Sequence, residues 1–188
     1  MHGALFCKNC LLVRHHQVPL HNVEVRHQPL QVRLILNDHT QMWNGLFFQR
    51  STLKELGLRV QLGHPPGQFC PTREPACKDF VVIHTNGIHL VNVDFCRCDS
   101  LPHRTQLLRV AWWPATPLEP KTCATMEVLR HFQLLNLQGK LTGFSFYRAL
   151  EYQTNNSGLN KPPVHRLLLY LTIVFTHAKY RTVSLRLC

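Results

Sequence analysis

The run FVVIHTNGIHLVNVDFCRC, residues 80–98, decides the fold. Two apolar, β-forming segments, residues 80–83 and 88–95, flank a Thr-Asn-Gly tripeptide at residues 85–87. Asn-Gly between two such segments is a strong hairpin signal, because both residues tolerate the positive φ angles of tight hairpin turns. The run therefore predicts a β-hairpin whose second strand ends at Cys96 and Cys98.

A short upstream loop carries a matching pair of metal-ligand residues. His64 and Cys70 bound the Pro/Gly-rich sequence HPPGQFC, which holds their side chains near one another. Two local pairs of such ligands are what a closed tetrahedral zinc site needs, so His64, Cys70, Cys96 and Cys98 are predicted to bind Zn²⁺. The alternative is that these cysteines only pack, since free cysteine is among the most buried residue types. Cys77 is a second-choice ligand.

Composition and charge limit the classes of partner. The chain has 188 residues, of which 45% are hydrophobic and 16% charged, enough for one moderate core. A net charge of +11 attracts acidic partners, nucleic acid first. Lys and Arg are scattered along the chain, however, and such charge also serves solubility. Charge alone therefore leaves nucleic-acid binding open.

The cysteine content is interpreted through the expected compartment. The N-terminal sequence MHGALFC lacks the apolar stretch of a secretory signal, so a reducing, intracellular setting is expected. In that setting eight cysteines and thirteen histidines favour zinc over disulfides. The apolar run at residues 167–175 is far short of the roughly 20 residues that span a membrane, so no membrane segment is expected.

Further elements are predicted downstream of the hairpin. A strand is predicted over residues 106–113, where Pro114 would end it. Two helices are predicted over residues 121–136 and 140–151 from apolar residues at helical spacing. Those apolar residues are Met126, Leu129, Phe132, Leu135, Phe144, Tyr147 and Leu150. The expected fold is α+β, a small zinc-stabilised domain with a β-hairpin and short strands followed by two helices.

Several other residues could be taken for functional ones. Trp112 and Trp113 could stack on bases, but an apolar strand that ends in proline favours a core role. His84 and His89 flank the hairpin turn and are predicted at the surface. Asp94 is expected to cap a turn, as is Asp99, and Cys123 is expected to have no special role.

No catalytic constellation emerges from the sequence. Two-metal nuclease chemistry needs clustered carboxylates, and the ten acidic residues show no convincing pairing across the predicted strands. No Gly-rich phosphate loop occurs, and no His or Asn partner is signalled for a cysteine nucleophile. The chain is predicted to be non-enzymatic.

Several uncommon strings occur in the order found in one fungal protein family. They include STLKELGLRVQLGHPPG at residues 51–67, TNGIH at 85–89 and FCRC at 95–98. Further matches are QLLR at 106–109, WPAT at 113–116, PKT at 120–122 and FYRAL at 146–150. Over residues 43–158 the chain resembles the second type of CxC cysteine-cluster domain associated with KDZ transposases.

The resemblance implies a function. The family's cysteine cluster is predicted to chelate zinc and lies N-terminal to an RNase H-like transposase domain in mobile elements of mushroom-forming fungi. A nuclear, zinc-binding accessory domain that assists binding to transposon DNA is therefore expected. One alternative is a protein-interaction module that docks on the KDZ transposase catalytic domain, and another is a degenerate fragment without function. No base-reading residue can be assigned, so DNA and RNA both remain open as targets.

The segments outside this match are less regular. In residues 1–42, Cys7, Cys10, His15 and His21 match the second half of the family's N-terminal pattern and satisfy tetrahedral coordination on paper. They are predicted as a second zinc site, with a frayed terminus as the alternative. An unstructured insertion over residues 25–41 and a divergent tail over residues 159–188 are also expected.

Overall fold

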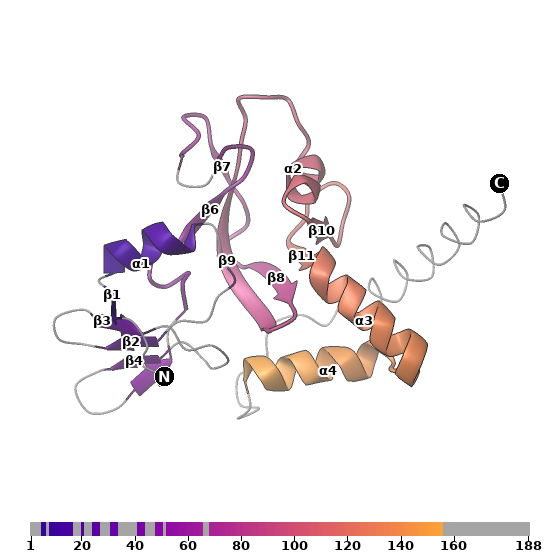
Figure 1. The fold of residues 1–188 in the computed structure, drawn as a ribbon. Helices are drawn as coiled ribbons and strands as arrows, with labels where there is room; N and C mark the ends of the chain where they lie inside the picture. Colours follow the sequence, from indigo (N-terminus) through magenta and orange to yellow (C-terminus); the bar gives the residue numbers. More distant parts are fainter. Residues whose placement is uncertain are drawn as a thin grey trace.

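The structure is a computed structural model with mixed helix and strand content, which confirms the expected α+β class. Figure 1 shows the order of its elements along the chain. The described residues are 5–6, 8–16, 20, 24–26, 31–33, 41–43, 48–50, 52–65 and 68–155. None of the helices in these ranges combines the length and hydropathy that crossing a bilayer requires.

A small sheet lies near the N-terminus. Its strand order is β1-β3-β2-β4-β5, and only the β2–β4 pair is parallel. The bounds are β1 (Leu5–Phe6), β2 (Glu24–Arg26), β3 (Gln31–Arg33), β4 (Gln41–Trp43) and β5 (Phe48–Arg50), with helix α1 (Lys8–His15) between β1 and β2.

A second sheet forms the centre of the molecule. Its order is β10-β11-β8-β9-β6, with β7 paired to the C-terminal end of β9. The bounds are β6 (Arg59–Gln61), β7 (Glu74–Pro75), β8 (Phe80–His84), β9 (Gly87–Phe95), β10 (Trp112–Pro114) and β11 (Thr122–Thr125). Strands β8 and β9 pair antiparallel with Phe80 opposite Val91 and His84 opposite Gly87, so the predicted hairpin is confirmed.

Strand β8 is buried on both faces. Successive strand side chains point to opposite faces, and Val81 and Ile83 belong to one hydrophobic cluster while Phe80 and Val82 belong to another. Such two-sided burial explains why this strand is a continuous apolar run and does not alternate with polar residues. The second cluster includes Leu20, whose carbonyl accepts a 2.9 Å hydrogen bond from the side chain of Asn86.

Helices α3 (Met126–Gly139) and α4 (Gly143–Thr154) pack against the first cluster. Thr125 caps α3 by accepting a hydrogen bond from Val128 N, and Thr142 caps α4 in the same way. Both helices were expected, but α3 begins five residues later than predicted because residues 122–125 form β11, parallel to β8.

The buried faces of the two helices differ in part from the predicted ones. Leu129, Phe132, Tyr147 and Leu150 are buried as expected. Met126, Leu135 and Phe144 are exposed, and their places in the core are taken by Val128 and Phe146. Met126 is the first residue of α3, and the buried face of this helix is formed by Val128, Leu129 and Phe132.

The prediction of a strand over residues 106–113 is wrong. Residues His103–Arg109 form helix α2, and only β10 is extended. A short apolar run fits a strand or a buried helix equally well by periodicity. Here Gln106 and Leu107 are both buried although they are adjacent, which a helix packed against a sheet allows.

The aromatic and histidine predictions have mixed outcomes. Trp112 is buried and Trp113 packs against the first cluster, so the core interpretation is confirmed. His84 and His89 were predicted at the surface and are half-buried. The ring of His84 lies 3.0 Å from Thr125 Oγ1, and that of His89 lies 2.8 Å from the side-chain oxygen of Asn86.

Gly87 is expected to be intolerant of any side chain. Its φ of +133° is a conformation that glycine alone adopts readily, and a Cβ there would lie 2.8 Å from Thr154 Oγ1. The same oxygen accepts a 2.7 Å hydrogen bond from Ile88 N. Gly87→Ala should lower the free energy of unfolding by about 1–3 kcal/mol in urea denaturation. Gly139→Ala is the control, because a Cβ there meets nothing within 4 Å; an equal loss in both variants would contradict the assignment.

Candidate metal centre

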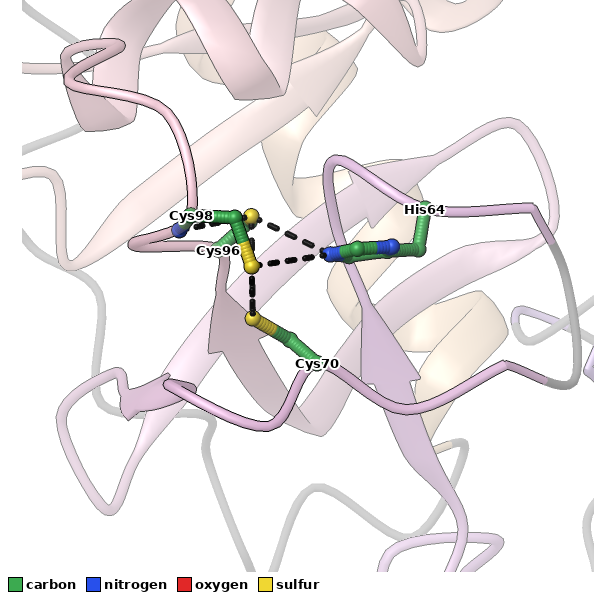
Figure 2. A group of neighbouring side chains, drawn as sticks. All are labelled: His64, Cys70, Cys96 and Cys98. Carbon is green, nitrogen blue, oxygen red and sulfur yellow. Dashed lines mark hydrogen bonds between the residues drawn. The ribbon is translucent and has the colours of Figure 1, made fainter.

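The pairing of two strands brings the predicted ligands together. Strand β6 runs parallel to β9, with Gln61 opposite Asp94. The chain leaves both strands at the same edge, so His64 follows the end of β6 where Cys96 follows the end of β9. Cys70 returns to this edge after the Pro/Gly loop, as Figure 2 shows.

The four ligand atoms form a tight group. His64 Nε2 lies 3.2 Å from Cys96 Sγ and 3.7 Å from Cys98 Sγ. Cys70 Sγ lies 3.6 Å from Cys96 Sγ and 3.3 Å from Cys98 Sγ. All four ligand atoms are within 4.8 Å of one another, so these residues are positioned to hold a metal ion.

The surroundings favour ionised thiols in part of the group. Burial raises the pKa of Cys70, but hydrogen bonds to its sulfur from Thr72, from the backbone of Arg97 and from Cys98 outweigh burial and lower the pKa to about 5. The Thr72 hydroxyl also favours the thiolate of Cys98, yet the hydrogen bonds with Cys70 and Cys96 raise the pKa of Cys98 overall. The negative charge of one thiolate thus disfavours ionisation of its neighbour, and a bound cation would relieve that repulsion.

An ion pair with a fully buried carboxylate lies at the end of β9, two residues before Cys96. Asp94 is 0% exposed, and both of its carboxylate oxygens accept hydrogen bonds from the Arg59 guanidinium, one at 2.7 Å from Nε. A guanidinium nitrogen of Arg73 lies 3.7 Å from the same carboxylate. Asp94 therefore ties β9 to β6 and to the loop that carries Cys70, and the expectation that it caps a turn is wrong.

The arginine between the two strand-end cysteines is also anchored. Arg97 Nε donates a hydrogen bond to Glu74 in β7, and His103 Nε2 lies 3.1 Å from the same carboxylate. The hydrogen bond from Arg97 is the main reason that the pKa of Glu74 falls to about 2. The ring of His103 stacks on Phe95 with 4.0 Å between centroids. These contacts fix the turn that holds Cys96 and Cys98.

The other predicted ligand residues are not gathered in this way. Cys7 and His21 lie outside the described residues, so the second site stays a prediction; Cys10 is exposed and His15 is buried. Cys77 is half-buried and does not join the group of four. Cys123 is fully buried, and burial raises the pKa of its thiol well above the usual value.

Three polar residues around the centre were missed by the sequence reasoning. Thr72 Oγ1 lies 3.4 Å from Cys98 Sγ, and the side chains of Gln61 and Gln106 reach the backbones of ligand cysteines. Gln106 offers a signal in retrospect, since it is a polar residue beside the apolar pair Leu107 and Leu108. Nothing in the sequence marks Thr72 or Gln61 in this way.

Comparison with known protein families bears on the whole of this region. The family model described as "CxC2 like cysteine cluster associated with KDZ transposases" matches residues 53–158, more than half of the chain. The chain belongs to this family. The CxC2-like region spans the β8–β9 hairpin, helices α3 and α4, and all four residues of the candidate metal centre. A search of curated proteins found no match, and neither did a search of solved structures.

Proposed function

We propose that the chain is a non-catalytic, zinc-binding accessory domain of a KDZ-type transposase that assists binding to transposon DNA. The observation that carries the zinc assignment is the group formed by His64, Cys70, Cys96 and Cys98. A tetrahedral zinc ion with ordinary bond lengths places its sulfurs about 3.8 Å apart, and a sulfur and a nitrogen about 3.6 Å apart. Four of the six separations are 3.3 and 3.6 Å between sulfurs and 3.2 and 3.7 Å from nitrogen to sulfur, and all six are within 4.8 Å, which suits such an ion.

The donor set supports a structural role for the ion. Three thiols and one imidazole fill all four positions of a tetrahedral zinc ion, whereas catalytic zinc keeps one position for water or substrate. The zinc would therefore join the loop of His64 and Cys70 to the end of β9 and activate no water. Elemental analysis of the protein, purified under reducing conditions, is expected to find at least about one zinc per chain. A folded protein without zinc would refute this part of the proposal.

The nucleic-acid part rests on charge and on the family. A chain with a net charge of +11 is attracted to any polyanion, and an accessory domain of a transposase would work in the nucleus beside transposon DNA. If the protein neutralises about four phosphates, its affinity for generic duplex DNA should fall about a hundredfold between 50 and 200 mM salt. Fluorescence anisotropy with a labelled duplex measures this slope. Absence of binding at low salt would remove the DNA role.

A second candidate function is docking on the transposase catalytic domain. Leu134, Leu137 and Phe144 are each more than half exposed on α3 and α4, whose opposite faces form the core. Exposed apolar residues of this kind favour a protein partner. Calorimetric titration with the purified catalytic domain should then give a binding signal that Phe144→Asp weakens and that changes little with salt. The salt dependence separates the two candidates.

A further inference from the structure

Two glutamine side chains hold the backbones of the ligand cysteines. Gln106 in α2 is 1% exposed, and its amide makes a paired contact with Cys96. Its Oε1 accepts a 2.8 Å hydrogen bond from Cys96 N, and its Nε2 donates a 2.8 Å hydrogen bond to Cys96 O. The same Nε2 also donates to Leu101 O at 3.0 Å. The amide thus takes the place of a neighbouring strand just beyond the end of β9.

Gln61 makes similar hydrogen bonds to the other ligand arm, the loop that carries Cys70. Its Oε1 accepts a 3.3 Å hydrogen bond from Cys70 N. Its Nε2 donates to Leu62 O at 2.9 Å and to Asp94 O at 3.2 Å. One side chain therefore links the Cys70 loop to both β6 and β9.

Close packing at Gly63 limits where Cys96 can lie. A Cβ at Gly63 would come within 2.6 Å of Cys96 Cβ and within 3.5 Å of Gln106 Oε1. The segment that leads to His64 is thus pressed against Cys96 on one side while Gln106 holds its backbone. Cys96 has little freedom to move away from the other ligands.

We propose that Gln106 and Gln61 are positioning residues that set the affinity of the centre for its metal, a proposal that rests on the zinc function above. Without these amides the N–H groups of Cys96 and Cys70 would lose their partners, and the two ligand arms would be less ordered before the metal binds. Ordering the two arms would then cost free energy when the ion binds, and the metal affinity would be lower. Hydrogen bonds that orient metal ligands typically change metal affinity by about 10–100-fold.

The test is Gln106→Met, which keeps the length of the side chain and removes its hydrogen bonds. Zinc release to a chelator in excess should become about 10–100-fold faster, measured well below the unfolding temperature of every variant. The visible absorption of the Co²⁺-loaded protein, which reports tetrahedral geometry, should change as well. Gln61→Met should act in the same direction with a smaller effect, since its bond to the Cys70 backbone is longer.

Leu107→Ala is the matched control for lost stability. Leu107 is the neighbour of Gln106 in α2 and is 0% exposed, but its apolar side chain forms no hydrogen bond to the backbone of a ligand cysteine. It should lower the unfolding temperature and leave the zinc release rate and the Co²⁺ spectrum unchanged. Gln133→Met on the exposed side of α3 controls for the exchange itself.

The outcomes separate this proposal from the zinc function. Wild-type zinc release in both Gln106→Met and Gln61→Met, or an equal effect of Leu107→Ala, would overturn the positioning role while the zinc function stands. A wild-type protein without zinc would overturn both. If Gln106→Met does not fold, the half-buried Gln61 still decides the question.

Discussion

Changing both Cys96 and Cys98 to serine is expected to remove one zinc ion per chain and to lower the unfolding temperature by at least about 10 °C. A serine hydroxyl is a far poorer zinc ligand than a thiolate, and two of the four positions would be lost together. Metal binding contributes directly to folding free energy where the ligands join separate segments. Elemental analysis and thermal unfolding followed by circular dichroism measure the two effects.

Cys77→Ser is the control for this pair of changes. Cys77 lies near the same loop but outside the group of four, so its substitution should leave the zinc content unchanged. Zinc loss in Cys77→Ser would show that this residue serves as a ligand. A double variant that keeps the zinc content and stability of the wild type would refute the metal centre.

Arg59→Met should lower the free energy of unfolding by about 3–5 kcal/mol, because it leaves a buried carboxylate without its main partner. Asp94 is 0% exposed, and its remaining partner, Arg73, is 3.7 Å away and half-exposed. Urea denaturation of the metal-bound protein at pH 7 measures the loss. Adding Asp94→Asn to Arg59→Met should recover part of it, because the unpaired charge is then gone.

An exposed ion pair provides the comparison. Asp79 pairs with Lys54 at 3.1 Å, but its side chain is 67% exposed. Asp79→Asn should change the free energy of unfolding by less than about 1 kcal/mol. If Arg59→Met lowers the free energy of unfolding no more than Asp79→Asn, the Arg59–Asp94 pair does not hold β6, β9 and the Cys70 loop together.

The parts of the structure that could be predicted are those specified by local sequence. The β8–β9 hairpin follows from its Asn-Gly turn between apolar runs, and the ligand group follows from two short spacings beside strand and loop ends. A turn type and a pair of ligands a few residues apart depend little on the rest of the chain.

The parts that could not be predicted depend on tertiary contacts. Residues 122–125 are extended because they pair with β8, which lies about 40 residues earlier and whose position the local pattern does not reveal. Residues 103–109 are helical because a helix can bury the adjacent residues Gln106 and Leu107 together. Periodicity in so short a run does not distinguish a helix from a strand. The amide of Gln106 finds its partner, Cys96, only in the folded chain.

Strand β9 connects the metal centre to helix α4, and this limits which insertions and deletions members of the family can accept in this strand. One of its ends leads into Cys96, and the other begins at Gly87 against Thr154 of α4. Inserting or deleting a single residue within β9 would turn the side chains beyond that point to the opposite face of the sheet and displace the ligand cysteines from the loop opposite. The exposed residues 116–119 between β10 and β11 carry no such restriction. Among relatives, insertions and deletions should therefore accumulate in that loop and be absent from the nine residues of β9.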